Sequence, residues 1–175
     1  MMNEKPCFIV AAMDLRRGIG YKGKLPWPKM LADFKRFRAL TLDNPIILGR
    51  KTFESYGSKP LPRRQHYVVS RHPTYVPPDA VRASSVESAI RRASFSECRH
   101  VSVIGGWEVF REALQQDSVD FMYLTRIEGE FPADVFFPDF PQDDWLLTSE
   151  DFFPKDAANP YPYTFLTYAR KEQMS

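Results

Sequence analysis

Short apolar runs that alternate with helical segments constrain the fold of this 175-residue chain more than any other feature. The first run, at residues 7–13, reads CFIVAAM and has the continuous hydrophobicity of a strand buried on both faces. Further strands are expected at 45–48, 66–70, 81–83, 101–104 and 121–125. Strands that alternate with helices predict a mostly parallel sheet.

The segments between these runs are expected to form about four helices, at 30–42, 51–56, 85–93 and 107–114. The last third of the chain differs, because two aromatic strand-like segments at 145–152 and 163–169 are joined by loops rich in Pro and Asp. Residues 14–24 are polar and glycine-containing, and we expect a mobile loop there. The predicted fold is α/β, with a central mostly parallel β-sheet, an antiparallel C-terminal hairpin and flanking helices.

Composition favours one domain over residues 1–175, with a core from about residue 7 to residue 170. The net charge is only +2, and the paired arginines are isolated, so no nucleic-acid partner is expected. The two cysteines and three histidines lack metal-ligand spacing, and no metal site is expected. No apolar run is long enough to cross a membrane. We expect a cytoplasmic monomer with reduced thiols.

Asp33 stands out on the first of these helices, which follows a Pro-Trp-Pro turn centred on Trp27. At 3.6 residues per turn, one helix face carries Met30, Phe34, Phe37 and Thr41, and Asp33 lies at its edge. Desolvation makes an unpartnered carboxylate costly there. Two interpretations stay open: a structural or solvated Asp, and a carboxylate with a chemical task.

Three strands share a second feature, which is the type of residue at their carboxyl ends. Leu48 is followed by GRKT, Val69 by SR, and Ile104 by two glycines and a helix. Ligands of open α/β sheets bind outside the carboxyl ends of strands, and helix N-termini there suit phosphate. These glycines, cations and hydroxyls predict a site for several phosphates. Neither GxGxxG nor GxxxxGK[ST] occurs, so a Walker-type NTPase is not supported.

The ordered set of motifs resembles the dihydrofolate reductase family over nearly the whole chain, from about residue 7 to residue 170. The residues that carry the resemblance are Val10-Ala11-Ala12, Gly18-Ile19-Gly20, Leu25-Pro26-Trp27, Asp33, Gly49-Arg50-Lys51-Thr52-Phe53, Pro60-Leu61-Pro62-Arg63-Arg64, Ser70-Arg71, Val103-Ile104-Gly105-Gly106 and Tyr123-Leu124-Thr125. The resemblance implies reduction of dihydrofolate to tetrahydrofolate by hydride transfer from NADPH, and binding of antifolate inhibitors.

The resemblance also implies roles for individual residues. Asp33 would be the ionisable group that binds the pterin, with a raised pKa in the empty pocket. Trp27 would hold an ordered water on the proton route. Arg64 would pair with the glutamate α-carboxylate. The implied substrate-binding residues are Val10, Ala11, Asp33, Phe34, Phe37, Tyr56, Leu61, Arg64, Ile104, Phe110 and Thr125.

The implied cofactor is NADPH, because cations and hydroxyls would surround a 2′-phosphate. The implied cofactor-binding residues are Ala12, Ile19, Gly20, Gly49, Arg50, Lys51, Thr52, Ser70, Arg71, Ile104, Gly105, Gly106, Trp107, Glu108 and Val109. The family places a cis peptide at its Gly-Gly pair, which is Gly105-Gly106 here.

Some residues depart from the family pattern. Asp33 lies six positions after Trp27, where many bacterial members have five, and Phe110 replaces a common Tyr. These departures predict weaker binding of diaminopyrimidine antifolates than of methotrexate-like ones. Two alternative functions are a pyrimidine reductase of riboflavin synthesis on the same fold and a non-catalytic nucleotide- or RNA-binding module. Asp33 and the PLPRR loop argue against the first alternative, and Asp33, Trp27 and the three strand-end motifs argue against the second.

Overall fold

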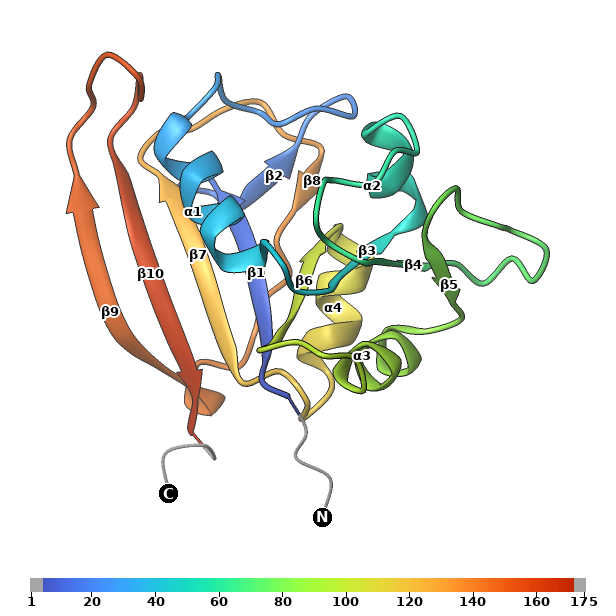
Figure 1. Ribbon diagram of the computed structural model, residues 1–175. Coiled ribbons are helices and arrows are strands. Elements are labelled where there is room, and N and C mark those ends of the chain that lie inside the picture. Colours follow the sequence, from blue (N-terminus) through green and yellow to red (C-terminus); the bar gives the residue numbers. More distant parts are fainter. Residues whose placement is uncertain (1–4, 172–175) are drawn as a thin grey trace.

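The computed structural model describes residues 5–171 and joins the predicted strands into one sheet (Figure 1). These strands are β1 (Cys7–Met13), β3 (Ile46–Gly49), β4 (His66–Val69), β5 (Val81–Ala83), β6 (Val101–Gly105), β7 (Phe121–Ile127), β9 (Trp145–Phe153) and β10 (Tyr163–Arg170). The eight-stranded sheet has the order β5-β4-β3-β6-β1-β7-β10-β9.

The pairing within this sheet confirms the predicted fold class. The strands from β5 to β7 run parallel to one another, and β10 pairs antiparallel with both β7 and β9. Crossovers therefore bring the carboxyl ends of β1, β3, β4 and β6 to one edge of the sheet, which is the upper edge in Figure 1. The C-terminal hairpin extends the sheet on the side of β7.

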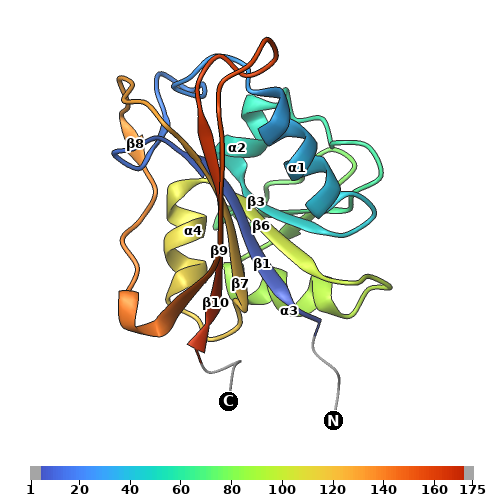
Figure 2. The ribbon, with the colours of Figure 1, turned by 90° about the vertical axis from the view of Figure 1, so that its left-hand side faces the viewer.

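Four helices lie where the sequence predicted them, within one residue at each end. They are α1 (Leu31–Thr41), α2 (Arg50–Ser55), α3 (Val86–Ser94) and α4 (Trp107–Leu114). Figure 2 shows α1 and α4 on opposite faces of the sheet. Of the described residues 5–171, no helix combines the length and the apolar character needed to cross a membrane.

The prediction of a loop over residues 14–24 was wrong in part, because this segment contains a short strand. β2 (Gly18–Gly20) pairs antiparallel with β8 (Val135–Phe136) in a second, two-stranded sheet. Asp14 anchors this region, since its buried carboxylate accepts backbone N–H groups from Arg16 at 2.9 Å, Gly18 at 2.8 Å and Phe131 at 3.0 Å. The strand depends on a partner more than a hundred residues away, which a local pattern does not reveal.

The core is formed by the central strands, in which Ile9, Ile47 and Val103 are fully buried. The apolar face of α1 behaves differently from the expectation. Met30 and Thr41 are buried, but Phe34 keeps 43% of its surface exposed. The ends of that face therefore pack on the sheet, and its middle remains open to solvent.

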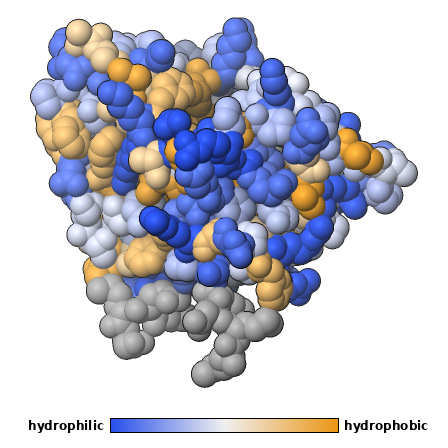
Figure 3. All heavy atoms as spheres, viewed as in Figure 1, coloured by the Kyte–Doolittle hydropathy of each residue, from blue (hydrophilic) through white to orange (hydrophobic). Residues whose placement is uncertain are grey.

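The outermost strand, β9, carries a further set of exposed apolar side chains. Figure 3 shows hydrophobic residues gathered on the left of the molecule, where Figure 1 places β9 and β10. Leu147, Phe152 and Phe153 on β9 are among the exposed large hydrophobic residues. They lie on the far side of β10 from the strand ends described above.

Candidate active site

The structure brings the predicted strand ends together. Leu48 of β3 is opposite Gly105 of β6, and Gly49 is opposite Val69 of β4. The approach is close, because a Cβ atom added to Gly49 would lie 3.2 Å from the Val109 side chain on α4. A side chain at position 49 would thus require the Val109 side chain to shift by a few tenths of an ångström.

Gly105 and Gly106 form the base of this junction. The peptide bond between them is cis, as the resemblance implied, and Gly105 has a φ of 139°, a conformation that favours glycine. A Cβ on Gly106 would lie 3.3 Å from the Thr52 hydroxyl. The α4 helix begins directly afterwards, and its N-cap residue Gly106 makes no side-chain capping bond. The free amides and the helix dipole at this point suit an anionic phosphate.

Cationic side chains surround this cradle of Gly49, Thr52, Gly105 and Gly106. Arg50 donates to Glu54 at 2.7 Å and stacks over the Tyr75 ring at 4.1 Å. Arg71 is exposed and donates to Glu112 at 3.2 Å. Each arginine has a carboxylate partner within the chain, with which a bound phosphate would compete.

Asp33 lies in the first turn of α1, close to Thr125 of β7. Burial raises the pKa of Asp33, while a hydrogen bond from Thr125 and the positive charge of Arg36 act in the opposite direction. Thr125 is almost fully buried and pairs with Ala12 at the carboxyl end of β1. Because β1 lies between β7 and β6, Asp33 and the glycine cradle flank the end of the same strand.

Arg36 is a component of this site that the sequence analysis missed. Its Nη1 atom donates to the carbonyl of Leu124 at 3.0 Å, next to Thr125. Its guanidinium carbon lies 4.3 Å from the Phe165 ring centroid and 5.6 Å from that of Tyr123. The spacing of three residues from Asp33 on one helix could have indicated this pair.

Apolar residues pack beside the strand ends that flank the site. Trp27 is buried in a cluster with Met30, Ile127 and Tyr163, and Ala12 packs against this cluster. The ring of Phe110 is buried behind Gly105 and packs on Phe137 at 5.1 Å. Asp33 is desolvated at this end of the sheet, and the positive charge of Arg36 partly offsets the effect of burial on its pKa.

The other predicted residues differ in exposure. Those that are buried are Val10, Trp27, Ser70, Gly105, Val109, Phe110 and Thr125. Those that are half-buried are Ala11, Ala12, Ile19, Gly20, Asp33, Phe37, Gly49, Thr52, Leu61, Arg64, Ile104 and Gly106. Those that are exposed are Phe34, Arg50, Lys51, Tyr56, Arg71, Trp107 and Glu108.

Arg64 is held in place by hydrogen bonds from its own guanidinium. Its Nε donates to the carbonyl of Pro62 at 2.9 Å, and its Nη1 donates to the Thr41 hydroxyl at 3.1 Å. Burial and the neighbouring charge of Arg38 lower the pKa of Arg64. An anionic partner would relieve both effects, so this corner of the site favours a carboxylate.

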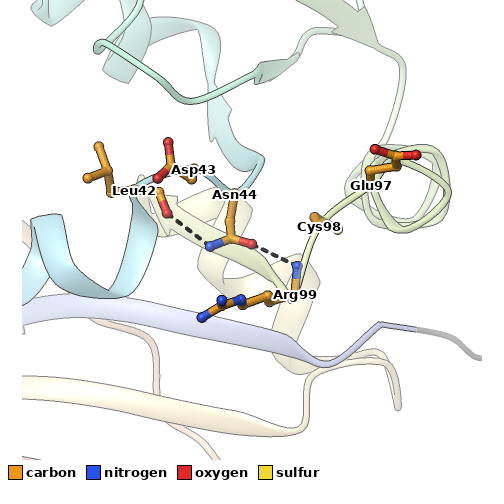
Figure 4. Close-up of a pocket in the computed structure, with 6 residues that line it drawn as sticks. All are labelled: Leu42, Asp43, Asn44, Glu97, Cys98 and Arg99. Carbon is orange, nitrogen blue, oxygen red and sulfur yellow. Dashed lines mark hydrogen bonds between the residues drawn. The ribbon is translucent and has the colours of Figure 1, made fainter.

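Two cavities lie outside the cradle. One, of about 450 Å³, separates the turn before α1 from the β9–β10 loop and is lined by Pro28, Lys29, Leu31, Ala157, Ala158 and Pro160. The other, of about 440 Å³, is lined by Leu42, Asp43, Asn44, Glu97, Cys98 and Arg99 (Figure 4). The second lies before β3 and β6, at the opposite edge of the sheet from the cradle. Its Asn44 amide bridges the carbonyl of Leu42 and the N–H of Arg99.

Within residues 5–171, no group of three or more His, Cys, Asp and Glu side chains could hold a metal ion.

Comparisons with known proteins agree on one family. A family model described as dihydrofolate reductase matches residues 7–170. The chain is 37% identical to a dihydrofolate reductase of Staphylococcus aureus over 94% of this chain and 98% of that protein. It is 35% identical to the type 3 dihydrofolate reductase of Salmonella typhimurium over 93% of this chain and 97% of that protein.

A solved structure is also similar. Dihydrofolate reductase from Enterococcus faecalis, complexed with NADP(H) and RAB-propyl, matches with a TM-score of 0.88 and 32% sequence identity. The match covers 95% of this chain and 97% of the other.

Proposed function

Because the chain belongs to the dihydrofolate reductase family, we propose that it reduces 7,8-dihydrofolate to 5,6,7,8-tetrahydrofolate with NADPH, and that Asp33 binds the pterin. One observation carries this assignment of the site. A desolvated carboxylate and a glycine-built phosphate cradle flank the end of one strand, β1. A pterin needs the first, and a dinucleotide needs the second.

In this proposal Asp33 accepts hydrogen bonds from the N–H and amino groups of the pterin, and Thr125 orients the carboxylate. Trp27 encloses the site and holds a water on the proton route. Val10, Ala11 and Phe34 border the ring, which excludes other water. NADPH supplies the hydride when it is bound, so the main contributions of this chain are orientation and electrostatics.

The remaining substrate contacts come from the two helices and the loop after α2. Phe37, Tyr56 and Leu61 pack against the benzoyl group. Arg64 pairs with the glutamate α-carboxylate, for which its fixed planar guanidinium is suited. Ile104 and Phe110 lie on the nicotinamide side of the pocket.

The cofactor contacts come from the strand ends. Ala12, Ile19 and Gly20 line the nicotinamide. Thr52 and the backbone from Gly105 through Val109 hold the pyrophosphate, since the free amides of α4 begin there. The residues that surround the 2′-phosphate are Arg50, Lys51, Ser70 and Arg71, and Gly49 precedes them at the end of β3.

The turn between Trp27 and Asp33 forms part of the pocket mouth. Pro28 and Lys29 of this turn line the cavity beside the β9–β10 loop. We propose that the extra residue in the turn reshapes the rim of the substrate pocket. We propose that diaminopyrimidine antifolates bind more weakly than methotrexate-like ones. Inhibition constants for both classes decide this, and equal tightness would contradict it.

We also propose that the chain folds as one domain and acts as a cytoplasmic monomer. Both cysteines, Cys7 and Cys98, are free thiols, which fits a reducing compartment.

The decisive assay follows NADPH absorbance with dihydrofolate, without it, and with the pyrimidine substrate of riboflavin synthesis. We expect NADPH to be oxidised when dihydrofolate is present, but not with the pyrimidine or without a second substrate. Turnover with the pyrimidine instead would establish the alternative reductase, and no turnover with either would favour the non-catalytic module.

A further inference from the structure

His66, the first residue of β4, is fully buried although it carries two polar ring nitrogens. Both nitrogens have partners in the loop that precedes the strand. Nε2 accepts the N–H of Leu61 at 3.0 Å, and Nδ1 lies 2.7 Å from the carbonyl oxygen of Arg64. A carbonyl only accepts, so Nδ1 carries the proton, and the ring is the neutral tautomer with Nε2 free to accept.

The surroundings favour this neutral form. Burial and the positive charge of Arg64 lower the pKa of His66, and the bond to the Arg64 carbonyl acts in the other direction. Phe53 of α2 lies against the ring, with centroids 5.9 Å apart. The imidazole therefore presents one hydrogen-bond donor and one acceptor at fixed positions.

The loop between these two bonds is otherwise anchored from the other side. Arg63 has a φ of 59°, and its guanidinium forms two hydrogen bonds with Asp43, at 2.9 Å and 2.6 Å. The N–H of Asp43 donates to the Arg63 carbonyl at 2.9 Å. Asp43 thus holds the middle of the loop, and His66 holds its two ends at Leu61 and Arg64.

We propose that His66 is a positioning residue for the substrate, which places Leu61 and Arg64 against the aminobenzoylglutamate half of dihydrofolate. This inference rests on the proposed function, which assigns those two residues to that half. His66 does not touch the reacting atoms. Its effect is on the part of the substrate that lies away from the pterin.

The test compares two substrates that share the reaction but differ in the tail. One is 7,8-dihydrofolate, and the other is 6-methyl-7,8-dihydropterin, which lacks the aminobenzoylglutamate. We expect His66→Leu to lower the ratio of kcat/KM for dihydrofolate to kcat/KM for the dihydropterin by about tenfold, mainly through the KM of dihydrofolate. A general loss of stability would lower both values and leave the ratio unchanged.

Two conservative variants separate the two hydrogen bonds and keep the test open if His66→Leu does not fold. The amide of His66→Gln reaches the position of Nε2 and keeps the acceptor for Leu61. The amide of His66→Asn reaches the position of Nδ1 and keeps the donor to Arg64. We expect each variant to have a ratio between that of wild type and that of His66→Leu, because each keeps one of the two hydrogen bonds. If both variants had the same ratio as wild type, the proposal would be overturned.

Arg64→Leu is the reference variant, because it tests the role of Arg64 separately from the role of His66. If Arg64→Leu leaves the ratio unchanged, the assignment of Arg64 under the proposed function is wrong. If Arg64→Leu lowers the ratio but the His66 variants do not, only the inference about His66 is wrong. In the Arg64→Leu background we expect His66→Leu to lower the ratio by less than it does in the wild-type background, because only its effect through Leu61 remains, and full additivity would contradict the proposal.

Discussion

The side-chain oxygen of Asn159 accepts the backbone N–H of Ala32 at 2.9 Å, across 127 residues of sequence. Met30, the N-cap residue of α1, makes no side-chain capping bond, so the helix that carries Asp33 is capped by the β9–β10 loop. The carboxylate of Asp156 in turn accepts hydrogen bonds from the side-chain amide of Asn159 at 3.0 Å and from the backbone N–H of Asn159 at 2.8 Å. The C-terminal hairpin therefore fixes the start of the active-site helix.

Asn159→Ala is expected to lower the free energy of unfolding by about 0.5–2 kcal/mol, which is the usual contribution of an N-cap. Urea unfolding of the apo protein measures this. Asp156→Ala removes the group that orients Asn159, so the double variant is expected to be less destabilised than the sum of the two single variants. An Asn159→Ala protein as stable as wild type would show that the bond does not cap α1.

Arg36→Met removes the positive charge nearest to Asp33 on α1. That charge favours the ionised carboxylate, so its loss raises the pKa of Asp33. The pH midpoint of the Asp33-dependent change in hydride-transfer rate is expected to move to higher pH. Lys35→Met, which removes an exposed cation from the same helix, is the matched control. Equal shifts in the two variants would mean that proximity to Asp33 is irrelevant.

Asp33→Asn is expected to stabilise the apo protein near neutral pH. Because burial raises the native pKa of Asp33 above its unfolded value, the native state binds the proton more tightly. Below about pH 4 the carboxyl group is protonated in both states and does not change the free energy of unfolding. Above its native pKa it is ionised in both states and lowers that free energy. Thermal unfolding at acidic and neutral pH measures the difference. A variant that is less stable than wild type at neutral pH would contradict this linkage.

Arg71→Gln is expected to lower kcat/KM for NADPH by about tenfold and to affect NADH much less, since only NADPH carries the 2′-phosphate. Glu112→Gln is the complementary variant, because Glu112 pairs with Arg71 in the structure. Loss of the Glu112 charge frees the Arg71 guanidinium, so the affinity for NADPH is expected to stay the same or to increase. Equal losses with both cofactors in Arg71→Gln would place this arginine elsewhere.

Local sequence patterns predicted the elements that depend on their own residues. The run at Cys7–Met13, the start of α3 next to Ser85 and the glycines at the ends of β3 and β6 all lie where expected. The side chain of Ser85 accepts the N–H of Ser88 at 3.0 Å, which is a bond within one turn. Such features need no information from distant residues.

What the sequence did not reveal depends on contacts between distant segments. Asn159 caps α1 from the far hairpin, and β2 exists because it pairs with β8. The exposure of Phe34 depends on how α1 packs on the sheet, which the helical period alone does not specify. These relationships are set by tertiary packing.

The most direct test of the role of Asp33 is the single-turnover rate of hydride transfer in wild type and Asp33→Asn, with saturating NADPH and dihydrofolate at neutral pH. Asn keeps the shape of Asp but carries no charge. We predict that the rate falls by about a hundredfold or more, as for loss of a positioned acid–base group. A rate close to that of wild type would contradict the assignment of Asp33 as the pterin-binding carboxylate.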